Sequence, residues 1–309
     1  MQLDRTRIAI RERGLLETID LALVVVREFC GPLLACALLA IVPLALINYA
    51  LVGWMAPTEF DDESFGFRYL WNMTVLIFLE APLASVFIVA YLGPAVFLEQ
   101  RTMRQVAADV LRQTLPLLLA QGLLRGVLVA WGLYLVTDRL EANGWIEGFL
   151  MIVLVLWSCA LRSFRPYINE IILLERNPLL AGRGAAITVS KRSSHLHGPY
   201  AGDLFIRWCG AAIIGGMLAV LVTYTAIMAQ GILITDWPFH FSMGEEGAFA
   251  WNLDWFKLQV VYPACLWLVV AFLAVVRFLS YLDLRIRHEG WEVELLMRAE
   301  ALRLAPQVE

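Results

Sequence analysis

Long apolar runs alternate along the chain with short segments that carry most of its charge. A helix that crosses a bilayer needs about 20 consecutive, mostly apolar residues, and six runs meet this requirement. They lie at about 32–54, 69–96, 116–137, 146–174, 203–233 and 257–280. The pattern predicts an all-α protein: a multi-pass transmembrane helical bundle with six spans in a single membrane domain at 1–280.

In the segment between the second and third runs, apolar residues are not continuous but recur with the period of a helix. Across residues 99–116, apolar side chains recur every three or four positions, with Arg101, Arg104 and Arg112 between them. An amphipathic helix with a basic face, placed between two spans, is expected to lie in the membrane surface with its arginines among lipid headgroups. Residues 15–30 have a similar pattern and predict a second surface helix.

The distribution of Lys and Arg predicts the orientation. Only Arg68, Arg139 and Lys257 lie in the three loops on one side of the predicted bundle, whereas most of the 24 basic residues lie in the segments on the other side. Loops rich in Lys and Arg stay in the cytoplasm. We therefore expect both termini, the surface helices and a helical tail at 281–309 to be cytoplasmic.

Three prolines are almost evenly spaced along the chain. Pro32, Pro116 and Pro199 each follow a charged segment and a predicted surface helix, and each lies where a span begins. Proline suits the first turn of a helix because that position has no helical partner for an N–H group. The layout predicts a three-fold hairpin repeat of surface helix, span, loop and span.

Composition narrows the class of protein. Hydrophobic residues make up 60% of the 309, charged residues 17%, and the mean hydropathy is +0.70, which excludes a soluble globular domain. Basic residues are not interleaved with aromatic ones as in nucleic-acid-binding proteins, so we expect no nucleic-acid partner. The five cysteines lie within or beside apolar runs and form no pattern of disulfides or zinc ligands, so we expect no metal and no cofactor.

Glu80 is the main candidate for a functional residue because it lies near the middle of a span. It is about 11 residues from the outer end, roughly 16 Å at 1.5 Å per residue. Ionisable groups at this depth are costly and face a partner inside the bundle. Arg125 has a similar depth in the next span, with Gln121 one turn away, so we expect Glu80 to pair with Arg125. The three residues either line a polar path or form a buried structural network in which Glu80 binds backbone groups freed by Pro82.

A second basic group lies at the cytoplasmic end of the fourth span. Arg162 and Arg165 precede Pro166, which is expected to kink the helix and free a carbonyl group. Together with Arg101 and Arg104 of the surface helix, they are candidates to contact an anionic lipid headgroup. The alternative is that these arginines only anchor the topology.

Motifs of membrane hydrolases and of nucleotide-binding enzymes are absent. The sequence has no H-E-x-x-H, no G-x-S-x-G and no P-loop. His195 and His197 lack the spacing found in lipid phosphatases. We expect no catalytic residue and no enzymatic activity.

The last span is expected to continue as a helix as far as Gly290, which permits a break. Beyond it, Trp291, Leu295 and Leu302 form a second apolar stripe beside acidic residues. This stripe either packs on the 99–116 helix or binds another protein.

Three segments carry a resemblance to a known group of proteins. They are YLDLRIRHEGW at 281–291, LLERN at 173–177 and LEAPL at 79–83. Together they resemble bacterial polytopic membrane proteins that are similar to the membrane domain of glycerophosphoryl diester phosphodiesterases. The catalytic domain of those enzymes has no counterpart in this chain. The resemblance therefore implies an architecture, a bacterial cytoplasmic membrane and an association with the cell envelope, but no activity.

These features favour a non-enzymatic function. The first hypothesis is an envelope-associated scaffold or assembly factor. It would contact the lipid bilayer and use its basic cytoplasmic surface and its tail to bind other membrane or envelope proteins. The alternative is a small transporter or lipid-handling protein with a polar path at Glu80 and Arg125.

Overall fold

The computed structural model describes residues 12–55, 63–99, 101–140, 144–179, 187–234, 239–241, 249–251 and 256–290. Within these residues, five helices are long and apolar enough to cross a membrane, and a bent pair makes a sixth if it counts as one span. The five are Cys30–Met55, Phe67–Val96, Ile146–Phe164, Val189–Leu233 and Lys257–Glu289, and the bent pair is Thr114–Leu124 with Val127–Val136. The prediction of a helical protein with several membrane-length apolar helices is confirmed.

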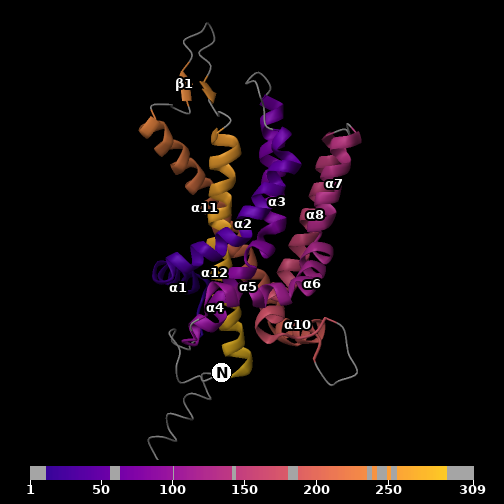
Figure 1. Cartoon of the computed structure of the whole chain (residues 1–309), viewed down its shortest axis with the longest axis vertical. Coiled ribbons are helices and arrows are strands. Elements are labelled where there is room, and N and C mark those ends of the chain that lie inside the picture. Colours follow the sequence, from indigo (N-terminus) through magenta and orange to yellow (C-terminus); the bar gives the residue numbers. More distant parts are fainter. Residues whose placement is uncertain are drawn as a thin grey trace, which may run out of the picture.

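The elements follow the predicted runs in chain order (Figure 1). The helices are α1 Leu15–Glu28, α2 Cys30–Val52, η1 Gly53–Met55, α3 Glu63–Ala84, α4 Val86–Val96, α5 Met103–Arg112, α6 Thr114–Leu117, η2 Leu118–Leu124, α7 Val127–Leu140, α8 Gly144–Phe164, α9 Ile168–Glu170, η3 Ile171–Glu175, α10 Val189–His197, η4 Gly198–Tyr200, α11 Ala201–Ile234, η5 Lys257–Val261 and α12 Tyr262–Glu289. A short antiparallel hairpin, β1 (Phe239–Phe241) and β2 (Phe249–Trp251), lies between α11 and η5.

The helices α3 and α12 form the centre of the bundle. α12 packs against α1, α3, α4 and α11. In the most apolar window of Phe67–Val96, 72% of the residues are buried, against 6% in the window of Val189–Leu233. In Figure 1, α11 and the α7–α8 pair lean away from α12 on opposite sides. α11 is therefore a peripheral helix, few of whose side chains are buried.

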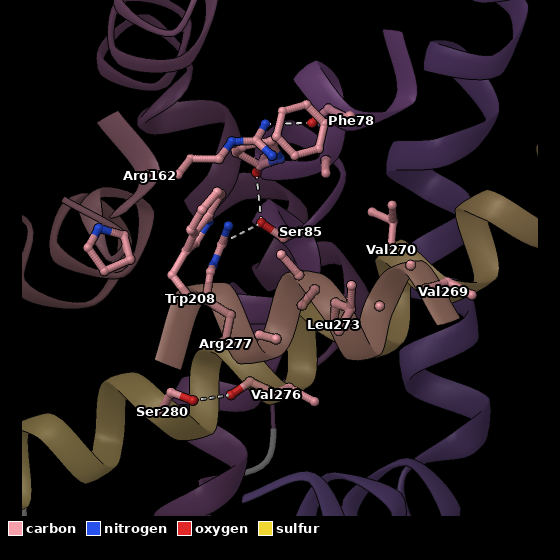
Figure 2. Close-up of a pocket in the computed structure, with 18 of the residues that line it drawn as sticks. Phe78, Ser85, Arg162, Trp208, Val269, Val270, Leu273, Val276, Arg277 and Ser280 are labelled. Carbon is pink, nitrogen blue, oxygen red and sulfur yellow. Dashed lines mark hydrogen bonds between the residues drawn. The ribbon is translucent and has the colours of Figure 1, made fainter. Parts of the chain in front are cut away.

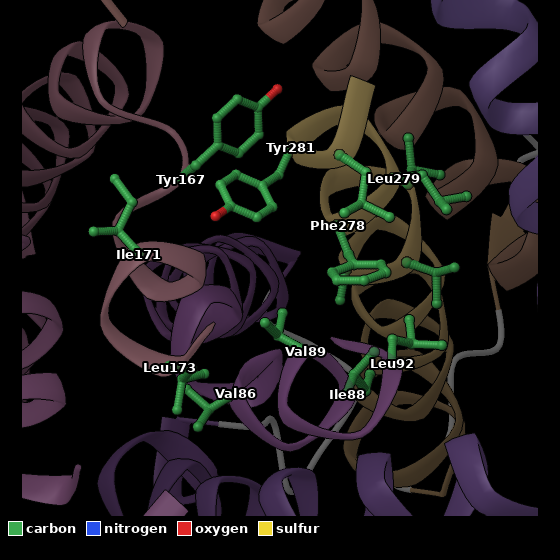
Figure 3. Packing of buried hydrophobic residues seen from close by; sticks show 14 of the residues in the cluster. Val86, Ile88, Val89, Leu92, Tyr167, Ile171, Leu173, Phe278, Leu279 and Tyr281 are labelled. Carbon is green, nitrogen blue, oxygen red and sulfur yellow. The ribbon is translucent and has the colours of Figure 1, made fainter. Parts of the chain in front are cut away.

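Two apolar clusters hold the bundle together. One joins α4, the 168–175 segment and α12, with Tyr167 and Phe278 among its buried members (Figure 3). The other joins α2, α3 and α7 and includes Leu76 and Tyr134. Because lipid tails are as apolar as leucine, close van der Waals packing rather than removal from water stabilises such contacts in a membrane.

Proline and glycine produce two breaks within the predicted spans. α3 ends at Ala84, just after Pro82, which has no N–H group to donate to the carbonyl of Phe78. Gly126 separates η2 from α7 and has φ +83°, a conformation that glycine adopts without strain. The chain bends by 61° at this point.

The fourth predicted span needs a correction. We expected one helix at 146–174, but α8 ends at Phe164 and the separate helical segment of α9 and η3 follows at 168–175. Pro166 lacks an N–H group and disfavours the helical conformation at Arg165, so it ends the helix instead of only kinking it. Ile171 and Ile172 are 0% exposed, so the second segment belongs to the core.

A helix forms at each predicted surface segment. α1 closely matches the predicted 15–30, and α5 lies within 99–116. A capping box begins α5: the N–H of Gln105 donates to Oγ1 of Thr102 at 3.4 Å, and the N–H of Thr102 donates to Oε1 of Gln105 at 3.0 Å. Val106 and Val110 of the expected apolar face are buried, whereas Leu111 is 69% exposed. Only part of that face therefore packs on the protein.

α12 continues well beyond residue 280, as predicted. It ends at Glu289, and Gly290 has the left-handed φ of 66° that favours glycine. The end of α12 at this position agrees with the expectation that Gly290 permits a break. Trp291, Leu295 and Leu302 of the tail lie outside the described residues.

The central position of α3 can be tested by changing leucine to alanine at a buried position in α3 and at an exposed position in α11. Leu76 is 0% exposed in α3, whereas Leu221 is 59% exposed in α11. We expect Leu76→Ala to lower the free energy of unfolding by about 2 kcal/mol or more because it leaves a cavity. Leu221→Ala should change it by less than about 0.5 kcal/mol. Unfolding in mild detergent measures both, and equal losses would contradict the arrangement.

Candidate functional site

A cavity of about 350 Å³ lies between α3, α8, α11 and α12. Most of its wall is apolar, with small residues on α11 opposite larger ones on α12. On α11 the small lining residues are Ala211, Ala212, Gly215, Gly216 and Ala219, next to the larger Leu204, Arg207 and Trp208; the α12 lining includes Leu266, Val269, Val270 and Leu273. The small side chains between 211 and 219 leave space that larger side chains would fill.

Two neighbouring glycines of α11 line this wall and differ in what surrounds them. A Cβ atom on Gly215 would lie 2.7 Å from Cδ1 of Leu273, so glycine permits the close approach of α11 and α12. At Gly216 the Cβ position faces open space, and the residue is exposed. Gly216 therefore lies at the exposed edge of the cavity, where a larger side chain would start without a clash at its Cβ atom.

Four arginines are the charged residues among those that line the cavity. Arg125 lies between η2 and α7, Arg162 in the last turn of α8, Arg207 in α11 and Arg277 in α12. Figure 2 shows the side chains of Arg162 and Arg277 on the same side of the cavity, both directed at the segment from Phe78 to Ser85. The cavity thus combines an apolar wall with a concentrated positive charge.

Arg162 is held by the break that Pro82 makes in α3. Its Nη2 donates to the carbonyl oxygens of Phe78 at 2.5 Å and of Leu79 at 3.1 Å. The Phe78 carbonyl needs an outside donor because Pro82 supplies no N–H group. The guanidinium also lies 4.1 Å from the centre of the Phe78 ring, within range of a cation–π interaction.

Arg277 is neutralised by a buried carboxylate. Its Nε donates to Oε1 of Glu170 at 2.9 Å, and its Nη2 donates to Oγ of Ser85 at 2.6 Å. Glu170 is 0% exposed. The pair connects α12 to α9 and to the junction of α3 and α4.

Asn169 completes the network around this junction. Its Nδ2 donates to the carbonyl of Pro82 at 2.6 Å and to Oγ of Ser85 at 3.4 Å. Gln121 donates to its Oδ1. The predicted residue Gln121 therefore supports the α3–α4 junction and does not line the cavity.

Arg125 is the most buried of the four arginines, at 1% exposure. Its Nη2 donates to the carbonyl of Arg165 at 2.8 Å. Its Nε is buried and has no acceptor among the described residues. The expected ion pair with Glu80 is wrong, because other groups within the described chain occupy both residues.

Glu80 lies on a different face of α3 from the cavity. Asn48 of α2 donates to its Oε2 at 2.8 Å, and the indole of Trp131 in α7 donates to its Oε1 at 2.6 Å. The carboxyl group is 0% exposed and does not line the cavity. It joins three helices through neutral side-chain donors. The structural alternative, in which Glu80 binds backbone groups freed by Pro82, is therefore wrong in its partners.

The other predicted arginines have separate positions. Arg165 contributes its carbonyl group to Arg125, and its side chain does not line the cavity. Arg101 pairs with Asp109 at 2.7 Å and with Glu99 at 3.4 Å on α5. Arg104 is exposed on the same helix. Of the four arginines predicted to contact a headgroup, only Arg162 therefore lies in the cavity wall.

Sequence reasoning missed Arg207 and Arg277 as members of the site, and Glu147 as a buried carboxylate. Glu147 is 2% exposed and accepts from Arg68 at 2.6 Å and from Asn72 at 2.5 Å. Each of these charged residues lies in or beside an apolar run, and that position is the signal, because such charges face partners inside a bundle. The sequence does not show which partner each one meets.

No group of three or more metal-ligating side chains forms in the described part of the chain. Comparison with protein families, with curated proteins and with solved structures found no match to this protein.

The link between Pro82 and Arg162 can be tested by a double-mutant cycle. Arg162→Met should lower the free energy of unfolding by about 1–3 kcal/mol because it leaves the Phe78 carbonyl without a donor. Pro82→Ala restores a backbone N–H group four residues after Phe78, so the loss should shrink in that background. Denaturation of the four proteins in detergent measures the coupling, and equal losses in both backgrounds would contradict it.

Proposed function

We propose that this protein is a non-catalytic lipid-handling protein that binds an anionic amphiphile in the cavity. The headgroup lies among the arginines, and a hydrocarbon chain lies along the wall of α11 and α12. One observation carries the proposal: Arg125 and Arg162 lie beside an apolar cavity, and their hydrogen bonds within the described chain go only to carbonyl oxygens.

The cost of buried charge supports an anionic ligand. A buried charge without a partner is strongly unfavourable, and proteins retain such groups where a partner or ligand completes them. The guanidinium group is suited to phosphate and carboxylate because its N–H groups form a planar fork. The apolar wall supports an amphiphile over a simple ion, because most of the contact surface matches hydrocarbon.

The open side of the cavity supports entry from the bilayer. Ala212 and Gly216 line the cavity and are exposed, and α11 is the most exposed of the membrane-length helices. A lipid could therefore enter past α11 without first leaving the hydrocarbon region.

The proposal includes a membrane topology. The bent pair of α6–η2 and α7 crosses as one span, which makes six spans in three hairpins with both termini in the cytoplasm of a bacterial cell. The concentration of Lys and Arg in alternate loops supports this orientation. Arg162 lies in the last turn of α8, at the end that this orientation places on the cytoplasmic side.

The scaffold hypothesis stays a prediction. It depends on Trp291, Leu295 and Leu302, which lie outside the described residues, and on the resemblance to envelope-associated membrane proteins. No contact in the described part of the chain favours it over lipid binding.

Native mass spectrometry of the protein released from nanodiscs tests lipid binding. We expect an anionic lipid bound to the wild type, less of it in Arg125→Gln, and its loss in Gly216→Leu. The first variant removes one of two charges, and the second places a large side chain at the exposed edge of the cavity. Arg104→Gln on the exposed face of α5 and Gly132→Leu, whose Cβ position also faces open space, are matched controls that should retain the lipid.

The same experiment separates the proposal from its alternatives. Glu80→Gln should also retain the lipid because Glu80 does not line the cavity. Loss of the lipid in Glu80→Gln alone would favour a polar path through Glu80. A protein partner that is bound in place of lipid, and lost on deletion of residues 291–309, would favour the scaffold.

The topology predicts opposite labelling of two loops. In a background without native cysteines, Cys at Arg139 should react with a membrane-impermeant thiol reagent on intact spheroplasts. Cys at Lys191 should react only after permeabilisation. If the bent pair were a re-entrant loop, the labelling would be reversed, because α8 still crosses the membrane between the two positions: Lys191→Cys would react on intact spheroplasts, and Arg139→Cys only after permeabilisation.

A further inference from the structure

The charges around the cavity do not balance within the described chain. Arg207 pairs with Asp203 at 2.9 Å and with Asp283 at 2.8 Å, and Arg277 pairs with Glu170 at 2.9 Å. Each of these guanidinium groups has a carboxylate. Arg207 and Arg277 therefore need no further counter-charge from a ligand.

Arg125 and Arg162 are different. Their described partners are the carbonyl oxygens of Arg165 and of Phe78 and Leu79, which carry no net charge. Each also has a buried Nε without an acceptor among the described residues. The site thus lacks two negative charges and has at least two unused N–H donors.

From this balance we infer that the headgroup is a terminal phosphate or diphosphate, and so carries about two negative charges. The inference rests on the proposed function and specifies its ligand. A phosphate monoester carries about −1.5 to −2 at neutral pH and has three terminal oxygens that accept hydrogen bonds. This charge balances the two guanidinium groups, and the phosphate oxygens can accept hydrogen bonds from their unused N–H groups.

Other anionic headgroups fit less well. A phosphodiester or a carboxylate carries one negative charge, so one of the two guanidinium groups would stay uncompensated in an apolar environment. The cavity therefore selects a lipid that ends in phosphate, such as phosphatidic acid or a long-chain alcohol phosphate, over phosphatidylglycerol. The two arginines could also bind free phosphate or pyrophosphate, but neither of these ions would make contacts with the apolar wall.

A competition between two lipids tests the charge of the headgroup. Phosphatidic acid and phosphatidylglycerol with identical acyl chains are offered together to the wild type in nanodiscs and counted by native mass spectrometry. At pH 8 we expect phosphatidic acid to be preferred by about tenfold or more. Arg125→Gln removes one charge and should bring the ratio close to one, whereas Arg104→Gln should leave the wild-type preference unchanged.

The pH dependence provides a second readout that does not need a variant. The second ionisation of a phosphate monoester has a pKa near 6, whereas a phosphodiester keeps one charge from pH 5 to 8. Below that pKa the two lipids carry the same charge. The preference for phosphatidic acid should therefore be full at pH 8 and largely lost at pH 5, with phosphatidylglycerol binding unchanged.

The outcomes distinguish this inference from the proposed function. Equal binding of both lipids at pH 8, with both lost in Gly216→Leu, would overturn the inference and leave lipid binding intact. No enrichment of either lipid would overturn both. Pyrophosphate that binds the detergent-solubilised protein equally well in wild type and in Gly216→Leu, without any lipid preference, would overturn a lipid as the source of the phosphate group.

Discussion

A helix inside a membrane has no water to satisfy its backbone, and this constraint explains how the polar part of the structure is assembled. Pro82 removes the N–H group that the Phe78 carbonyl would accept from, and Arg162 supplies the replacement donor from the end of α8. Asn169 binds the carbonyl of Pro82 itself. One proline in the most central segment of the bundle therefore attracts side chains from α8 and from the 168–175 segment. It fixes where an arginine can lie within an apolar environment.

The cavity depends on a second local feature, the small residues in part of α11. Gly215 lets α11 approach Leu273 closely, while the open position of Gly216 leaves unfilled space beside the same contact. A bundle selected only for stability would fill such a space, because close packing is the main stabilising force between helices in lipid. The combination of unfilled volume with two guanidinium groups that lack carboxylates favours a binding site over a packing defect.

The polar residues of the bundle separate into groups with different functions. Glu80 joins α2, α3 and α7, and Glu147 joins α8 to α3 through Arg68 and Asn72. Both carboxylates are satisfied by donors within the described chain and lie outside the cavity wall. They stabilise the arrangement of α3, α7 and α8, whereas Arg125 and Arg162, which hydrogen-bond only to carbonyl oxygens within the described chain, are the groups proposed to bind an anion.

Hydrophobic periodicity and length by themselves determined the membrane-length helices, the surface segments and the end of α12 at Gly290, because these depend on local composition and on the conformations open to proline and glycine. The sequence also identified Glu80, Gln121, Arg125 and Arg162 as buried or interfacial polar residues. Only the tertiary structure decided their partners. Glu80 and Arg125 have similar depths but face different neighbours, since the direction of a side chain depends on how each helix is rotated and where it breaks. The break after Pro82 lies beside Glu80 and the bend at Gly126 lies beside Arg125, and the direction that the chain takes after each cannot be calculated from spacing along the chain.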